Sequence, residues 1–107
     1  MEVKEFIQRT VSDNPIVLFM KGSAQAPQCG FSARTVQILE ACGVDNLVTV
    51  NVLEDEEVRQ GVKDYSNWPT IPQLYIGGEF VGGSDIVYEM YQSGELQKLI
   101  AGATPPA

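Results

Sequence analysis

The sequence predicts a single α/β domain, a four-stranded mixed sheet with helices on both faces. The 107 residues, 44% of them apolar, are enough for one hydrophobic core and too few for two domains. Helix-like and strand-like hydrophobic patterns alternate in the order helix, strand, helix, strand, helix, strand, strand, helix, helix. A glycine pair joins the last two strands, so we expect a hairpin there and parallel pairing of the earlier strands.

The first half of the chain is predicted to form two helices on either side of a buried strand. Apolar residues recur with i, i+3, i+4 and i+7 spacing over residues 3–11, and Pro15 prevents this helix from continuing. The run Ile16–Met20 is continuously apolar, which is typical of a strand buried on both faces. A second helix is expected over Gly30–Ala41, because Gly43 follows as a stop signal.

The second half is predicted to contain a strand, a helix, a hairpin and two closing helices. Residues 47–52 have the pattern of the strand, and the acidic residues 54–57 suit the N-terminus of the next helix. Residues 73–76 and 79–81 are expected to pair as the hairpin. The domain spans residues 1–107, with 103–107 expected to be a frayed tail. In the first closing helix, Ile86, Val87, Met90 and Tyr91 are expected to face inward, and Leu96, Leu99 and Ile100 belong to the last helix.

Composition argues against several classes of function. Seven basic residues against 14 acidic residues give a net charge of −7, so binding to a nucleic-acid backbone is not expected. No apolar stretch approaches the roughly 20 residues that a bilayer-spanning helix needs, so we expect no membrane segment. The chain has no histidine, which removes Cys-His hydrolases, Ser-His-Asp triads and imidazole-ligated metals. Two cysteines are too few for a disulfide scaffold and indicate a reducing compartment.

Cys29 is the candidate reactive residue. It follows the loop that leaves the buried strand and immediately precedes a helix, where unpaired N–H groups and the helix dipole lower the pKa of a thiol. The flanking Pro27, Gln28 and Gly30 favour a loop over the alternative, a buried structural cysteine. Ser32 stands where a dithiol redox enzyme carries its second cysteine, so Cys29 cannot close a Cys-x-x-Cys disulfide. Its chemistry therefore needs a sulfur from a small thiol, another protein or inorganic sulfide.

Cys42 is expected to be structural. It lies near the far end of the same helix, and a rise of ~1.5 Å per residue places it about 20 Å from Cys29. The two thiols cannot join or share a small metal centre at that distance. Cys42 shares a helix face with Val36 and Leu39, which favours packing in the core.

Four further signals are weak alone and gain weight together. A cis proline in Thr70-Ile71-Pro72 would leave the Ile71 backbone free to pair with an extended ligand, and an ordinary loop proline is the alternative. Gly82-Gly83-Ser84-Asp85 offers either a simple helix cap or an anion-binding helix N-terminus with a carboxylate for an ammonium. Lys21 and Arg59 are candidate carboxylate clamps or ordinary surface charges. Together these signals suit a ligand with carboxylates at both ends, an amine at one end and a thiol between.

These motifs, in this order, resemble a monothiol glutaredoxin of the CGFS type. The resemblance extends over about residues 6–100 and implies a thioredoxin-like fold that binds glutathione. A lone Cys-x-x-Ser would be a weak signal, but the full set at this spacing is specific. The matching segments are Phe19-Met20-Lys21-Gly22, Cys29-Gly30-Phe31-Ser32, Val36-Gln37-Ile38-Leu39, Asn51-Val52-Leu53-Glu54-Asp55, Tyr65-Ser66-Asn67, Trp68-Pro69-Thr70-Ile71-Pro72-Gln73-Leu74 and Gly82-Gly83-Ser84-Asp85.

The resemblance implies roles for the residues at one end of a bound glutathione. Lys21 and Arg59 match the positions that hold its glycine carboxylate. The backbone of Ile71 matches the position that pairs with the cysteinyl unit, and Pro72 matches the family's cis-proline.

At the other end of the ligand, the resemblance implies that Ser84 and Asp85 hold the γ-glutamyl group. Cys29 is then both the catalytic thiol and the metal ligand. Many members carry cysteine where Ser84 stands, so a second-thiol disulfide with Cys29 is not expected in this chain. Redox cycling would depend on external glutathione instead.

The resemblance implies a carrier of a [2Fe-2S] cluster, held in a homodimer by two Cys29 thiolates and two glutathione thiols. The implied partners are a BolA-like protein and the scaffold, chaperone and acceptor proteins of iron–sulfur assembly, with no nucleic acid and no membrane. The alternative is a weak glutathione-dependent oxidoreductase that deglutathionylates proteins through Cys29 alone, and a pure interaction module is a third hypothesis. The mitochondrial matrix is the expected location, with the chloroplast stroma or bacterial cytoplasm as alternatives.

Overall fold

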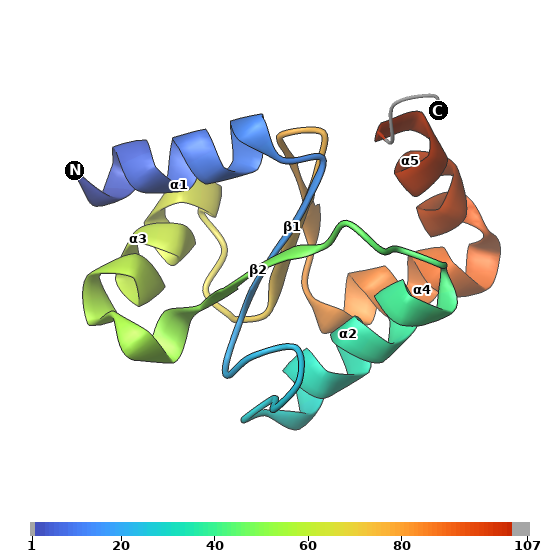
Figure 1. The fold of residues 1–107 in the computed structure, drawn as a ribbon, viewed down its shortest axis with the longest axis horizontal. Coiled ribbons are helices and arrows are strands. Elements are labelled where there is room, and N and C mark those ends of the chain that lie inside the picture. Colours follow the sequence, from blue (N-terminus) through green and yellow to red (C-terminus); the bar gives the residue numbers. More distant parts are fainter. Residues whose placement is uncertain (1, 104–107) are drawn as a thin grey trace.

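The computed structural model describes residues 2–103 of the chain. Within them, helices and strands alternate in the predicted order, with one additional 3-10 turn, η1 (Figure 1). In chain order the elements are α1 (Val3–Asp13), β1 (Ile16–Met20), α2 (Gly30–Ala41), β2 (Val48–Asn51), η1 (Val52–Glu54), α3 (Glu56–Ser66), β3 (Gln73–Ile76), β4 (Glu79–Gly82), α4 (Ser84–Ser93) and α5 (Glu95–Ala103).

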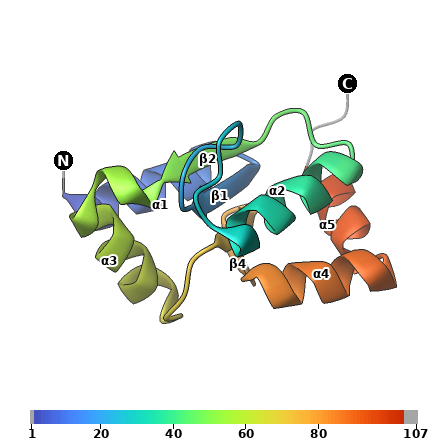
Figure 2. The ribbon, with the colours of Figure 1, turned by 90° about the horizontal axis from the view of Figure 1, so that it is seen from below.

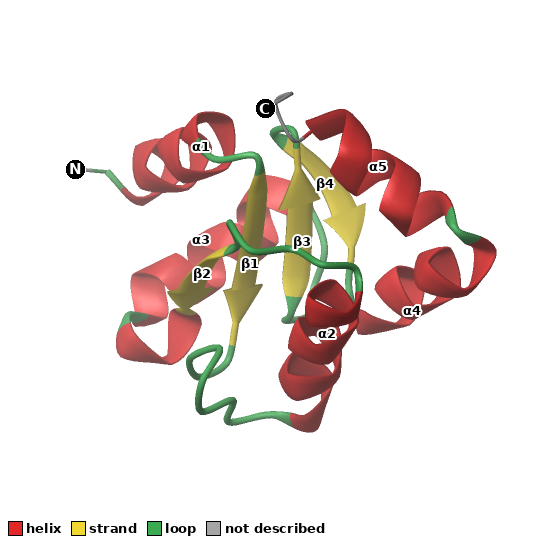
Figure 3. Cartoon of the chain, turned by 45° about the vertical axis from the view of Figure 1, so that its right-hand side comes forward, coloured by secondary structure: helices red, strands yellow, loops and turns green. Residues whose placement is uncertain are grey.

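The strands form a mixed sheet in the order β2-β1-β3-β4 (Figure 3). β1 pairs with β2 in parallel, with Val17 opposite Val48, and with β3 in antiparallel orientation, with Leu18 opposite Leu74. β3 and β4 form the predicted hairpin. All residues of β1 are buried, which confirms the prediction of a strand covered on both faces.

Helices cover both faces of this sheet. α1 and α3 pack together on one face, whereas α2 and α4 pack together on the other, with α5 beside α4 (Figure 2). The side chains of β1 alternate between these two layers, as the pleat of a strand requires. Ile16, Leu18 and Met20 join the core beneath α2, α4 and α5. Val17 and Phe19 join the core beneath α1 and α3, so the predicted fold class is confirmed.

The end of β2 differs from the prediction. The strand covers Val48–Asn51 rather than residues 47–52, because the Asn51 side chain accepts a hydrogen bond from the N–H of Leu53 (3.0 Å) and starts a 3-10 turn. α3 then begins at Glu56, where the side chain of Asp55 caps the first turn by accepting a backbone hydrogen bond (2.9 Å). The polar side chains at these two positions therefore set where the strand stops and where the helix starts.

At the C-terminal end, α5 includes Ala103, so the first residue of the predicted frayed tail is helical. The rest of that tail, residues 104–107, lies outside the described residues. None of the helices described here is long and apolar enough to cross a bilayer.

Candidate functional site

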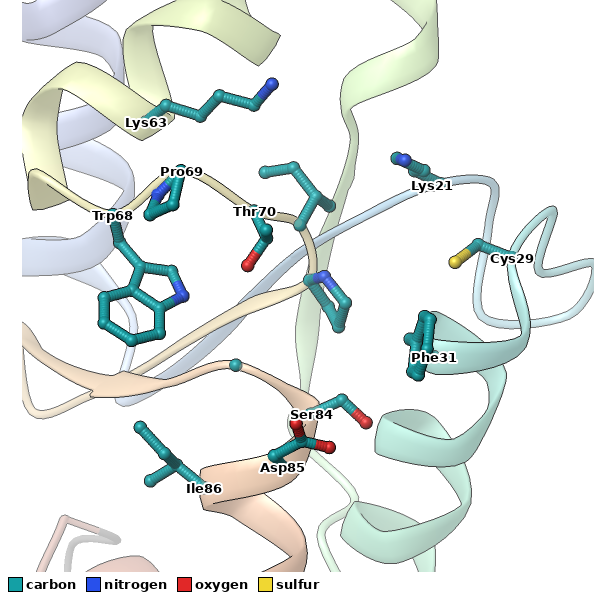
Figure 4. A pocket seen from close by; sticks show the side chains of 13 residues that line it. Lys21, Cys29, Phe31, Lys63, Trp68, Pro69, Thr70, Ser84, Asp85 and Ile86 are labelled. Atoms are coloured by element: carbon teal, nitrogen blue, oxygen red, sulfur yellow. The ribbon is translucent and has the colours of Figure 1, made fainter.

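Cys29 lies at the N-terminus of α2, as predicted. Its backbone is extended (φ −150°, ψ 135°) and it occupies the N-cap position of the helix. Its side chain makes no capping hydrogen bond, so the amides of the first turn remain available to a negatively charged sulfur. The thiol is half-buried, and its sulfur points into the space between α2 and the segment that carries Pro69 and Thr70 (Figure 4).

The surroundings of Cys29 favour the thiolate. Its pKa is lowered, chiefly because the backbone N–H of Ser32 stabilises the charged sulfur. Partial burial opposes this effect, while the N–H of Phe31, the charge of Lys21 and the Ser32 hydroxyl reinforce it. The helix N-terminus therefore activates the thiol in the way that the sequence predicted, with the positive charge of Lys21 as a smaller contribution.

Ser32 has a structural role beyond replacing a second cysteine. It is fully buried, and its Oγ accepts a hydrogen bond from the backbone N–H of Lys21 (3.1 Å). This bond joins the end of β1 to the first turn of α2. It thereby fixes the position of Lys21 relative to Cys29.

The loop between β1 and α2 folds as a small hairpin. Gly22 and Pro27 form an isolated antiparallel bridge, and the N–H of Gln28 donates to the carbonyl of Lys21 (2.9 Å). Gly22 has a φ of +91°, and a β-carbon there would lie 2.5 Å from the Gln28 nitrogen, so glycine is required on both counts. The Asn51 side chain accepts a hydrogen bond from the N–H of Gly22 (3.0 Å) and ties the hairpin to β2.

The segment between α3 and β3 forms the opposite wall of the site. Its peptide bond between Ile71 and Pro72 is cis, as the resemblance implies. The segment leaves α3 through Asn67, which has left-handed backbone dihedrals (φ 55°, ψ 39°) and ends the helix. The indole of Trp68 then packs against Phe80 of β4, with ring centroids 6.0 Å apart.

The N-terminus of α4 closes the third side. Gly83 occupies the N-cap position and has no side chain to cap the helix. The first backbone amides of α4 are therefore open to an anion. Ser84 is 7% exposed, and its Oγ is a buried polar atom without a hydrogen-bond partner among the described residues. Because a buried hydroxyl without a partner is costly, this oxygen is suited to a polar group of a ligand.

These three segments border one open cavity of about 480 Å³ (Figure 4). The ammonium groups of Lys21 and Lys63 lie along one side of it, and Ser84 and Asp85 lie on the opposite side, with the Cys29 sulfur at the α2 end. The lining residues are Lys21, Cys29, Phe31, Lys63, Trp68, Pro69, Thr70, Ile71, Pro72, Gly83, Ser84, Asp85 and Ile86. The arrangement can receive an elongated molecule with carboxylates at its ends and a sulfur between them.

The predicted site residues lie on this cavity with one exception. Arg59 is absent from its lining, and its guanidinium lies 3.9 Å from the carboxylate of Glu56. Lys63, which sequence reasoning missed, lines the cavity from the next turn of α3. The i, i+4 spacing of Arg59 and Lys63 puts both on one helix face, which is the signal that could have identified Lys63. The role of Arg59 as a clamp stays a prediction.

Two large apolar side chains of the cavity were also missed as site residues. Phe31 is 60% exposed and Trp68 is 38% exposed, on opposite sides of the opening. Their signal in the sequence is only their position next to Cys29 and within the segment before the cis-proline. Exposed aromatic side chains at a cavity are typical of surfaces that contact a ligand or a partner.

Cys42 lies at the other end of α2 as its C-cap residue. It packs against the core formed with α4 and α5, and burial raises the pKa of its thiol. Among the described residues, no group of three or more cysteine, aspartate or glutamate side chains is arranged to hold a metal ion. The chain therefore brings one thiol to the cavity, and the structural role expected for Cys42 agrees with its packing.

The chain is similar to known proteins over nearly its whole length. The profile of the glutaredoxin family matches residues 16–81. Glutaredoxin 4 of Escherichia coli K12 is 55% identical over 96 residues, which cover 90% of this chain and 83% of that protein. The mitochondrial monothiol glutaredoxin-5 of Schizosaccharomyces pombe is 54% identical over 101 residues, which cover 92% of this chain and 69% of that protein.

Solved structures give the same result. Reduced apo GrxS14 of poplar matches with a TM-score of 0.84 at 50% identity, over 96% of this chain and 97% of that one. The holo form of glutaredoxin C1 from Populus tremula × tremuloides matches with a TM-score of 0.86 at 27% identity, over 98% of this chain and 92% of that one. The family profile, these relatives and the single cavity thiol agree: the chain belongs to the glutaredoxin family and is a monothiol glutaredoxin.

Proposed function

We propose that the cavity binds glutathione with its sulfur beside Cys29. Lys21 and Lys63, whose ammonium groups lie along one side of the cavity, would hold the glycine carboxylate, with Arg59 as a further clamp. At the other end, the open amides of α4 and the unpartnered Ser84 Oγ suit the γ-glutamyl carboxylate, and Asp85 suits the amino group. The segment with Ile71 and Pro72 lies between the two ends, where the cysteinyl backbone would pass.

We further propose that glutathione and Cys29 together hold a [2Fe-2S] cluster as cargo. Such a cluster takes four thiolates, and each chain presents one thiol at the cavity because Cys42 packs against the core at the far end of α2. Two chains with two glutathione molecules complete the set. The observation that carries this proposal is that the Cys29 thiol opens into a cavity of about 480 Å³. The first turn of α2 lowers the pKa of this thiol.

The proposed dimer would deliver its cluster by ligand exchange. Two of the four ligands are glutathione molecules that are not covalently attached, so an acceptor thiolate can displace them, or Cys29, while the two chains separate. We propose that the cluster comes from scaffold and chaperone proteins and passes to acceptor proteins, with a BolA-like protein as another partner. Relatives of this chain include a protein named as mitochondrial and one from a bacterium, and we propose the mitochondrial matrix as its location.

A second candidate function is supported by the same thiolate. In a glutathione-dependent oxidoreductase, the Cys29 thiolate would attack the glutathione sulfur of a protein–glutathione disulfide, and the protein thiolate would leave. A second glutathione thiolate would then attack the glutathionylated Cys29, which releases glutathione disulfide and restores the Cys29 thiolate. One thiol suffices for these steps. The hairpin of residues 21–28, which stands beside Cys29, argues for slow turnover of bulky protein substrates.

The carrier proposal is tested by anaerobic reconstitution with iron, sulfide and glutathione, followed by visible absorption and size exclusion. We expect a coloured dimer that forms with glutathione and fails to form without it. Cys29→Ser should abolish the colour, whereas Cys42→Ser, a matched replacement in the core, should retain it. A colourless monomer that turns over a glutathionylated substrate would favour the oxidoreductase. A Cys29→Ser protein that kept a stable glutathione-dependent cluster would overturn the assignment.

A further inference from the structure

Gln73 is the first residue of β3 and a polar side chain that the cavity does not use directly. It is fully buried, although glutamine is rarely found inside a core unless its amide is satisfied. Its Nε2 donates two hydrogen bonds, to the carbonyl of Trp68 (3.1 Å) and to the carbonyl of Thr70 (3.2 Å). Both of these carbonyls belong to residues that line the cavity.

We propose that Gln73 is a positioning residue for the ligand-binding wall: its side-chain amide fixes the backbone of residues 68–70 and thereby the place of Trp68, Thr70 and Ile71. This inference rests on the proposed function, because the ligand of that wall is taken to be glutathione. Gln73 itself contacts no ligand in this account.

The other hydrogen bonds that the described residues make to this segment lie at its beginning. The N–H of Trp68 donates to the carbonyl of Lys63 (3.2 Å) and to the Oγ of Ser66 (3.1 Å). These bonds tie the segment to the end of α3, before it reaches the cavity. The two bonds from Gln73 tie it to the sheet on the other side. Without Gln73, the segment would keep the hydrogen bonds of Trp68 to α3 and lose the two hydrogen bonds from the first residue of β3.

Trp68 and Pro72 bring this segment close to the N-terminus of α4. A β-carbon on Gly83 would lie 3.5 Å from the indole Nε1 and 3.3 Å from the carbonyl of Pro72. The indole and the cis-proline segment therefore lie close to the N-cap of α4. A shift of residues 68–70 would change the cavity wall and the approach to the α4 amides together.

The amide of Gln73 is held in one orientation. Its Oε1 accepts a hydrogen bond from the hydroxyl of Tyr75 (3.4 Å), two residues along β3. A flipped amide would point its oxygen at two carbonyl oxygens, so the orientation with both donors toward the segment is the favourable one. Burial raises the pKa of Tyr75 to about 12, and its hydroxyl therefore remains a donor throughout the range in which the protein would be studied.

Three variants separate the proposal from a merely structural role. Gln73→Met keeps the length of the side chain and removes both donors, together with the acceptor of the Tyr75 hydroxyl. Gln97→Met makes the same change at an exposed site on α5. Gln73→Glu keeps the shape and, when ionised, places a carboxylate against the carbonyls of Trp68 and Thr70. Protonation of that buried carboxyl restores a donor, so the defect should be relieved as the pH falls. The neighbouring titratable groups are the hydroxyls of Tyr75 and Tyr65.

The experiment measures glutathione affinity by calorimetry and the acrylamide quenching of tryptophan fluorescence. Trp68 is the single tryptophan of the chain, so its quenching reports directly on the segment. For Gln73→Met we expect about tenfold weaker glutathione binding, because the released segment must be ordered again when the ligand binds. We also expect stronger quenching of Trp68. Gln97→Met should match the wild type in both. For Gln73→Glu, the ratio of its dissociation constant to that of the wild type should fall as the pH is lowered.

The outcomes distinguish the two proposals. The positioning role would be overturned if the wild type binds glutathione and Gln73→Met shows the same affinity and the same Trp68 quenching as the wild type. If Gln73→Met does not fold, a Gln73→Glu ratio that stays constant with pH would overturn it, and a ratio that falls would support it. If the wild type binds no glutathione, the proposed ligand is wrong, and increased Trp68 quenching in Gln73→Met would still support the positioning of the segment by Gln73.

Discussion

Replacement of Ser32 by alanine tests how the first turn of α2 activates Cys29. The change removes the hydroxyl and leaves the backbone N–H groups of residues 31 and 32 in place. It therefore separates two contributions to the thiolate: the amides, led by that of Ser32, and the Ser32 hydroxyl, which is the weakest of the effects that lower the pKa of Cys29. It also removes the acceptor for the N–H of Lys21 (3.1 Å).

The two consequences should differ in size. Ser32 is fully buried, so the Lys21 N–H loses its partner in a site with little access to water, and the free energy of unfolding should fall by about 1–2 kcal/mol. The pKa of Cys29 should rise only slightly and stay below that of an ordinary cysteine, because the backbone amides still stabilise the sulfur. Ser32→Ala should therefore weaken the fold more clearly than it weakens the thiolate.

The assay combines guanidinium unfolding with the pH dependence of Cys29 alkylation by iodoacetamide. Ser93→Ala is the matched control, because Ser93 is an exposed serine whose Oγ also accepts a backbone hydrogen bond, from Glu95 (3.3 Å). Its loss of stability should be ~0.5 kcal/mol or less. An alkylation profile of Ser32→Ala that coincides with that of a free cysteine would show that the hydroxyl, and not the amides, activates Cys29. Unchanged stability would show that the bond to Lys21 contributes nothing.

Four further predictions follow from the same geometry. Gly22→Ala should lower the unfolding free energy by about 3 kcal/mol, because a left-handed φ and a contact of 2.5 Å with the Gln28 backbone both oppose a β-carbon; denaturant unfolding measures it. Alkylation of Cys29, followed by mass spectrometry, should begin at lower pH than that of Cys42, whose pKa is raised by burial. The free energy of unfolding of Cys42→Ser should exceed that of Cys29→Ser/Cys42→Ser at pH values above the pKa of an unfolded thiol. This difference should disappear as the pH falls through the pKa of Cys29 in the folded protein, which is lower. Lys63→Glu should weaken glutathione binding about tenfold by calorimetry, because a favourable charge contact is reversed.

Three of these predictions have a control within the chain. Gly102→Ala places a methyl group in open space on α5 and should not destabilise the protein. Lys98→Glu reverses an exposed charge on the same helix, away from the cavity, and should leave glutathione affinity unchanged. Equal effects of Gly22→Ala and Gly102→Ala, or of Lys63→Glu and Lys98→Glu, would contradict the account. So would identical alkylation profiles for Cys29 and Cys42.

The fold could be predicted from the sequence because its signals are local. A continuous apolar run identifies β1, and the glycine pair at 77–78 identifies the hairpin of β3 and β4. These patterns do not determine the order of the strands in the sheet, since nothing in a strand's own residues indicates that β3 pairs with β1. The end of β2 was also missed, because the turn there depends on which N–H groups the Asn51 side chain reaches.

The site was predictable where its residues belong to compact motifs. Cys29 directly precedes a helix, and Ser84 and Asp85 begin another, so their placement follows from the ends of those helices. Lys63 shares a helix face with Arg59, but that spacing alone does not indicate which of the two turns of α3 approaches the segment at residues 68–72. The part played by Gln73 was not predicted either. Its two hydrogen bonds to that segment depend on how the chain folds back before β3.

The central claim is that this chain carries a cluster bound by Cys29 and glutathione and passes it on. The most direct test mixes the reconstituted dimer with an apo-ferredoxin and follows the circular dichroism of the cluster in the presence of an iron chelator. We predict that the spectrum changes to that of the ferredoxin while the carrier becomes a colourless monomer, and that the chelator captures little iron. Loss of iron to the chelator without formation of holo-ferredoxin would contradict the claim.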